Sequence, residues 1–223
     1  MRRSLQQLSA INPTRVDDVT RTSLAVVKSA FGTALDGFKL PYGDVAIGGW
    51  RNTPYVVIQN VGAYLDTPRF LDSEHPVADA SDAEAYLARL AAFPAQLDGE
   101  LERLASAGRI GAIAPSFLLD KAIRQMEMTL QDAQGGGGLV DSLVRRTAAI
   151  PGDWGTRARS LATGPVAAAL GRQLAELKAQ RARASDHAGL WARPRGDEWY
   201  AWGLRASTTT SPEPVTPSSR IAL

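Results

Sequence analysis

The chain contains two histidines, His75 and His187, and no cysteine. A zinc peptidase of the helix-borne type needs two histidines four residues apart, with a glutamate beside the first, so that both imidazoles face one metal ion. His75 follows the polar run 72–74, which is typical of a solvated turn before a helix, and His187 lies beside Asp186 in a polar segment. The sequence therefore predicts no metal site and no cofactor in this chain.

Other catalytic chemistry is also poorly supported by the residue types. Without cysteine there is no thiol nucleophile, disulfide or thiolate zinc site, and the serines lack a nucleophile-elbow pattern. The glycine run 135–138 is not followed by Lys-Ser/Thr, so it favours a flexible linker over a phosphate loop. The paired carboxylates Asp17/Asp18 and Glu100/Glu102 are expected on solvated helix surfaces. No catalytic constellation is predicted.

Aromatic residues gather near the C-terminal end, at Trp199, Tyr200 and Trp202. Aromatic side chains at such spacing bury large areas, so we expect them to pack in a core or to dock a helix. Lining a pocket is the alternative for this cluster.

The charge balance does not indicate a nucleic-acid partner. Lys and Arg number 25 against 23 Asp and Glu, and the basic stretch 172–195 is expected to form a solvated face of a helix. No interleaved aromatic residues or zinc-finger spacing accompany this stretch. The N-terminal residues 1–8 lack the apolar run of a signal peptide, and no run reaches the length of a membrane span, so we expect a cytoplasmic chain.

Helical periodicity dominates the sequence between its ends. A capping box at Ser81 and a helix-opening Pro115-Ser116 are among the start signals, and Pro94 is expected to kink or interrupt its helix. The run 55–58 could form a strand instead of part of a helix. The expected helices cover residues 14–37, 54–65, 81–108, 115–133, 139–150, 153–183 with an interruption at Gly164-Pro165, and 197–206.

These elements predict an all-α fold, an irregular array of about seven helices. The predicted organisation is a helical region 1–134, a glycine linker 135–138, a second helical region 139–207 packed on the first, and a tail 208–223. The tail is rich in Pro, Ser and Thr, and is expected to be disordered.

Three segments resemble a known bacterial family. They are residues 54–72 (PYVVIQNVGAYLDTPRFLD), 114–121 (APSFLLDK) and 188–210, which contains AGLW, GDEWYAW and LRASTTT. Their order and spacing resemble the domain-of-unknown-function 885 family over roughly residues 10–210. That family is similar to the zincin metallopeptidases, is mostly helical, and carries a His-Glu-x-x-Pro-Gly-His motif in its later half.

The resemblance implies a zinc-dependent peptidase or amide hydrolase for complete members, many of them exported. The zinc motif has no counterpart here, so no catalytic residue is carried over, and we expect a truncated chain that is inactive alone. As substrate-contacting candidates we name Tyr64, Trp199, Tyr200 and Arg205. A peptide-like substrate is expected only when a catalytic half is supplied.

Two hypotheses for function follow. In the first, the chain is the helical, non-catalytic portion of a zincin-like hydrolase, with apolar helix faces that lead to self-association when exposed. In the second, it is a free-standing helical binding or interaction protein derived from that scaffold. The behaviour of the purified chain distinguishes them.

Overall fold

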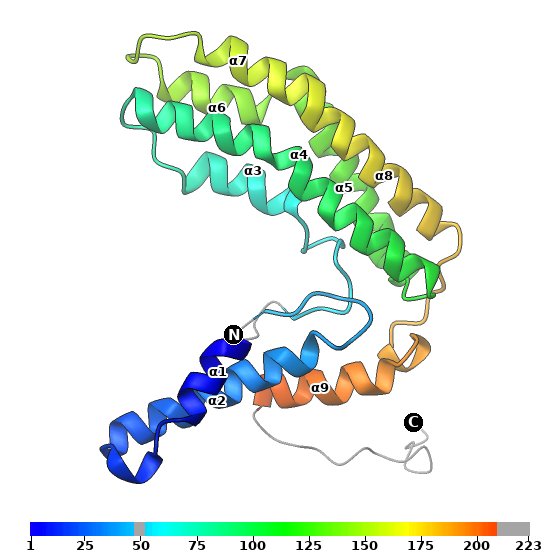
Figure 1. Cartoon of the computed structure of the whole chain (residues 1–223). Helices are drawn as coiled ribbons and strands as arrows, with labels where there is room; N and C mark the ends of the chain where they lie inside the picture. Colours follow the sequence, from blue (N-terminus) through cyan, green and yellow to red (C-terminus); the bar gives the residue numbers. More distant parts are fainter. Residues whose placement is uncertain (47–51, 209–223) are drawn as a thin grey trace. The chain divides into compact units, whose positions relative to one another are not determined.

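The computed structural model describes residues 1–46 and 52–208, and all regular secondary structure in these ranges is helical (Figure 1). The predicted all-α fold is therefore confirmed. Contacts divide the chain into two compact units. The terminal unit comprises Met1–Pro54 and Ala188–Leu223, and the central unit comprises Tyr55–His187. No helix in the described ranges is long and apolar enough to span a membrane.

The terminal unit joins helices from the two ends of the sequence. Its helices are α1 (Arg2–Ser9), α2 (Asp18–Gly37) and α9 (Gly196–Thr208), with 3₁₀ turns at Pro13–Arg15 and Leu190–Ala192. Helix α2 packs against both α1 and α9 (Figure 1). The predicted helix 197–206 is confirmed as α9, and the predicted tail lies outside the described residues apart from Thr208.

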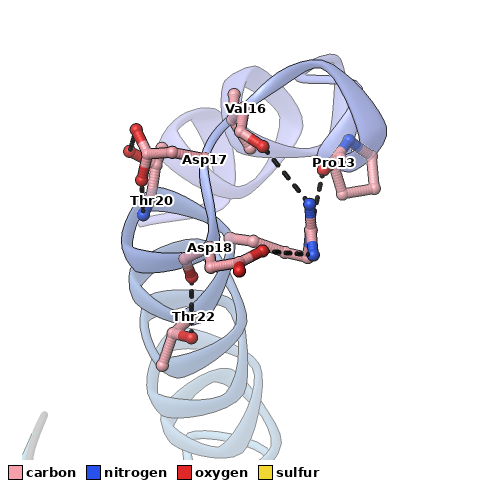
Figure 2. A network of polar contacts seen from close by, with 7 residues as sticks. Pro13, Val16, Asp17, Asp18, Thr20 and Thr22 are labelled. Atoms are coloured by element: carbon pink, nitrogen blue, oxygen red, sulfur yellow. Dashed lines mark hydrogen bonds and ion pairs between the residues drawn. The ribbon is translucent and has the colours of Figure 1, made fainter.

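The start of α2 is fixed by polar contacts (Figure 2). The carboxylate of Asp17 accepts a hydrogen bond from the backbone N–H of Thr20 at 2.7 Å, which caps the helix. The Arg21 guanidinium donates to the carbonyl of Pro13 at 3.0 Å and to Asp18 at 2.8 Å, and so ties the preceding turn to the helix. The predicted helix 14–37 therefore starts later than expected, at the capped end.

The central unit contains α3 (Ala63–Ser73), α4 (Ala80–Arg109), α5 (Ser116–Gly135), α6 (Gly138–Arg146), α7 (Trp154–Leu161) and α8 (Ala167–Arg181). A π-helical turn, Ala162–Val166, joins α7 to α8 at the predicted Gly164-Pro165 interruption. Helix α8 packs against α4 and α5, while α3 packs against α4 and α6 (Figure 1). The core includes the fully buried side chains of Tyr64, Tyr86, Phe93, Leu97, Leu119, Met126, Leu143, Leu170 and Leu177.

The helix expected over 54–65 is wrong. Residues 54–62 are irregular, and Ile58 and Val61 form an isolated antiparallel bridge through two backbone hydrogen bonds. Gly62 then adopts a φ of +137°, which L-residues rarely adopt, and α3 begins at the next residue. The side chains of Val57 and Ile58 are buried without helical backbone. Tertiary burial thus overrides the local helical pattern here.

The start of α4 also differs from its prediction. Asp79, not Ser81, is the N-cap, and its side chain accepts from the backbone N–H of Asp82 at 3.0 Å. A carboxylate two residues upstream fills the capping role better than the hydroxyl, since it also favours the positive end of the helix dipole. The helix continues through Pro94 as one element of 30 residues, so the proline does not interrupt it.

The glycine run joins two helices within the central unit. Gly135 is the last residue of α5, Gly136 has the left-handed conformation with a φ of +67°, and Gly138 is the first residue of α6. A left-handed residue after a helix is the usual C-terminal stop, and glycine adopts it without steric cost. The division of the chain by contacts falls elsewhere, near residues 54 and 188.

Candidate functional site

The terminal unit contains a groove lined by described residues. It has a volume of about 320 Å³ and lies between α2 and α9. Most of its wall consists of small or apolar side chains, with one cationic residue. The lining residues are Ala25, Val26, Ser29, Ala30, Thr33, Ala34, Ala46, Asn52, Trp202, Arg205 and Ala206.

The small residues of α2 and one aromatic side chain of α9 shape this groove. Trp202 is buried, and its indole N–H donates to the backbone carbonyl of Thr33 at 2.8 Å. The Trp202 ring meets the ring of Trp199 edge to face, with centroids 5.2 Å apart. A Cβ at Gly37 would overlap the Trp202 ring, so glycine is needed for this close approach. The orientation of Trp202 is therefore well determined.

A cluster of charged side chains lies beside this groove. Arg205 donates to Asp36 at 2.8 Å through Nη2, and Lys39 contacts the other oxygen of Asp36 at 2.8 Å. The hydrogen bond from Lys39, together with the charges of Lys39 and Arg205, lowers the pKa of Asp36 below its usual range. The Nε atom of Arg205 is buried and has no hydrogen-bond partner. The cluster combines two cations with one carboxylate, and it contains an unsatisfied donor.

The predicted substrate-contacting residues are divided between the two units. Arg205 lines the groove, whereas Trp199 is buried beside it and donates through its indole N–H to the carbonyl of Tyr42 at 3.1 Å. Tyr200 is 57% exposed. Tyr64 belongs to the central unit. Sequence reasoning missed Asp36, although an aspartate and a lysine three residues apart near a helix end were visible.

Tyr64 forms part of a buried polar network in the central unit. Its hydroxyl lies 3.0 Å from the carbonyl oxygen of Ile58 and 3.1 Å from Oε1 of Gln125. Burial raises the pKa of Tyr64 well above its usual value, and the nearby Glu100 raises this pKa further. Glu100 is only 9% exposed, so its expected place on a solvated surface is wrong. Its carboxylate accepts from the backbone of Ala63 and thereby gains the partners that its burial requires.

The histidines do not fit a zinc ion. His75 is 3% exposed, so the expected solvated turn is wrong there, and its ring packs between Phe70 and Tyr86. Its Nε2 lies 3.0 Å from the carbonyl oxygen of Asp82, and its Nδ1 is buried without a hydrogen-bond partner. His187 is exposed, as expected. No group of three or more metal-ligating side chains occurs in the described ranges.

The fold and these sites define a helical protein of two units, with an apolar groove in one and a buried carboxylate network in the other. The chain belongs to the family described as "Bacterial protein of unknown function (DUF885)", which matches residues 1–216. Among solved structures it is similar to the crystal structure of the "putative lipoprotein from Colwellia psychrerythraea", with a TM-score of 0.78 and 16% sequence identity. The match covers 94% of this chain and 37% of that chain. No curated protein matches it.

Proposed function

We propose that this chain is the helical, non-catalytic portion of a zinc hydrolase-like protein of the family, and that its helices form one wall of a substrate cleft. The proposal is supported by the share of each chain that the structural match covers. Nearly the whole chain, 94%, aligns with only 37% of the larger Colwellia chain. In such a protein the metal-binding groups come from elsewhere in the longer molecule, and the present residues position the substrate.

The placement of the titratable side chains agrees with a scaffolding role. Glu100 and His75 are buried and engage backbone groups. The ion pair of Arg157 with Glu84 links two helices at the surface, where the hydrogen bond from Arg157 lowers the pKa of Glu84. Groups held in this way support packing.

Exposed apolar side chains on α2 also favour a chain that is covered by another part of a longer protein. Val19 is 77% exposed and Val26 is 61% exposed, and their seven-residue spacing puts them on the same side of the helix. Phe38, just after the helix, is 55% exposed. We expect the isolated chain to self-associate and to bind a hydrophobic dye, as judged by size-exclusion chromatography and fluorescence.

Metal content and hydrolysis test the proposal. The purified chain and a complete member of the family are compared for zinc by elemental analysis and for cleavage of a peptide library. We expect the complete member to contain zinc and to cleave, and the present chain to do neither. Stoichiometric zinc with cleavage in this chain overturns its non-catalytic role, whereas a complete member without either property overturns the hydrolase assignment.

The groove between α2 and α9 favours a second candidate function, a free-standing helical binding protein. Its volume of about 320 Å³ falls within the usual size of a small-ligand site. A monodisperse, monomeric chain that binds a small apolar ligand in this groove supports this candidate over the first.

A further inference from the structure

We propose that the groove between α2 and α9 binds a small apolar ligand that ends in a carboxylate, and that Arg205 holds this carboxylate. The inference concerns the terminal unit alone and does not depend on the hydrolase proposal. It rests on the walls of the groove, on its charge, and on one unsatisfied donor.

The walls select an apolar ligand. Six of the lining residues are alanines or a valine, and Trp202 adds an aromatic face. Two of the polar groups nearby are already engaged: Asn52 accepts from the backbone N–H of Ala46 at 2.8 Å, and the carbonyl of Thr33 accepts from Trp202. An apolar ligand body in this space therefore leaves these two groups with their hydrogen bonds intact.

The charge selects an anion. Arg205 is the only charged lining residue among those described, and its neighbour Asp36 is shared with Lys39. The cluster of two cations and one carboxylate has an excess of one positive charge. A ligand that carries one negative charge neutralises this excess.

The guanidinium of Arg205 is only partly engaged within the protein. Asp36 occupies Nη2, while the buried Nε–H has no acceptor. A buried donor without an acceptor is unfavourable, and 37% of the Arg205 side chain is exposed where it lines the groove. A small shift of this side chain on binding lets the guanidinium donate to a ligand oxygen. A guanidinium forms such bonds in a fixed plane, so an arginine suits this role better than a lysine.

A singly charged carboxylate suits the site better than a phosphate. Arg205 lies in the last turn of α9, where the partly negative carbonyl end of the helix repels anions. One guanidinium with an excess of one charge compensates a monoanion, but it does not compensate a dianion. The same chemistry could come from a fatty acid or from the C-terminus of an apolar peptide.

Binding of matched probes tests the proposal. Decanoate and N-acetylphenylalanine represent the two sources, and decanol and N-acetylphenylalanine amide are their neutral counterparts. Isothermal titration calorimetry gives the affinities, and quenching of tryptophan fluorescence reports on Trp202, with Trp202→Phe as reference. We expect at least one carboxylate to bind roughly tenfold or more tightly than its neutral counterpart. The stronger of the two identifies the source.

Three variants locate the site. Arg205→Met is expected to remove the preference for the carboxylate, and Asp36→Asn, which leaves the cations less compensated, is expected to increase it. Ala30→Phe fills the groove and is expected to abolish binding of both probes while Arg205 remains in place. The control is Arg181→Met in the central unit, where Arg181 forms a comparable ion pair with Asp120.

The proposal is overturned if no probe binds, if the neutral probes bind as tightly as the carboxylates, or if Arg181→Met reduces binding as much as Arg205→Met. Circular dichroism of each variant verifies its helical content. If Arg205→Met loses its fold, Ala30→Phe and Asp36→Asn still decide the outcome, because the first occupies the space and the second changes the charge.

Discussion

The carboxylate of Glu100, on α4, accepts hydrogen bonds from the backbone N–H of Ala63, the first residue of α3, at distances of 2.9 and 3.1 Å. The N-cap of α3 is Gly62, which has no side chain to serve this N–H. Gln173 of α8 donates to the same carboxylate at 3.2 Å. One acidic side chain therefore links three helices of the central unit.

Loss of this carboxylate is expected to destabilise the central unit. Glu100→Ala leaves the N–H of Ala63 buried without an acceptor and leaves the Gln173 amide only its hydrogen bond to the carbonyl of Leu97. We expect a loss of about 3 kcal/mol in the free energy of unfolding. Glu100→Gln keeps one acceptor, and we expect about half that loss. Urea denaturation followed by circular dichroism measures both. Glu102→Gln, an exposed control, is expected to change stability by under about 0.5 kcal/mol; equal effects at the two positions contradict the capping role.

Alkaline pH is expected to destabilise the central unit through Tyr86. Burial raises the pKa of Tyr86 from 10.0 to about 12, and its hydroxyl donates to the carbonyl of Leu139 at 2.7 Å. The folded state thus keeps the phenol protonated in a range where the unfolded chain ionises. The stabilisation is complete below pH 10 and is lost as the pH rises to about 12, with a slope of at most about 1.4 kcal/mol per pH unit.

Tyr86→Phe tests this pH dependence. The variant is expected to lose about 1 kcal/mol at neutral pH, because the hydrogen bond to Leu139 is gone, and to show a shallower decline of stability above pH 10. Urea midpoints measured across the alkaline range give both quantities. The control is Tyr200→Phe, which removes an exposed hydroxyl. If stability above pH 10 declines as gently in this control as in Tyr86→Phe, the buried phenol is not the cause.

Two glycines of α2 are expected to respond in opposite directions. At Gly37 a Cβ would overlap the ring of Trp202, so Gly37→Ala should displace the indole, reduce stability by about 1–3 kcal/mol and alter tryptophan fluorescence. At Gly32 a Cβ meets nothing within 4 Å, so Gly32→Ala should stabilise the helix by up to about 1 kcal/mol. Thermal unfolding and emission spectra of the two variants measure the difference, and stabilisation by Gly37→Ala contradicts the close packing.

Adjacent arginines of α6 offer a further contrast. Arg146 donates to the carbonyl of Leu71 at 2.9 Å and also to that of His75, so it satisfies acceptors at the C-terminal end of α3. Arg145 has a single exposed contact with Asp72 at 3.5 Å. Arg146→Met is expected to cost about 2 kcal/mol, and Arg145→Met under about 0.5 kcal/mol. Hydrogen exchange of the α3 amides should quicken in the first variant only.

Local sequence patterns predicted those elements that neighbouring residues in the sequence determine. The start of α5 at Ser116, the interruption at Gly164-Pro165 and the last helix follow from proline, glycine and apolar spacing. The helix expected over 54–65 failed because burial of Val57 and Ile58 in the core, rather than helical periodicity, determines that backbone. The central unit thus departs from local preference where distant residues supply the partners.

The same reason explains what was missed in the candidate sites. Glu100 and His75 have charged or polar neighbours in sequence, so they are expected in solvent, yet their partners Ala63 and Asp82 become available only through folding. The groove is formed by helices from opposite ends of the chain. Arg205 was singled out from the sequence, but no local pattern pairs it with Asp36.

The π-helical turn between α7 and α8 keeps one row of side chains facing the core along both helices. Trp154, Ala158, Ala162, Val166 and Leu170 are all buried and recur at every fourth residue. In an α-helix each such step advances the side chain by about 40° beyond a full turn, so the row would drift away from the core. The wider turn at Ala162–Val166 holds more residues per revolution and takes up part of that drift. Two helices with an irregular joint can therefore present one continuous apolar edge.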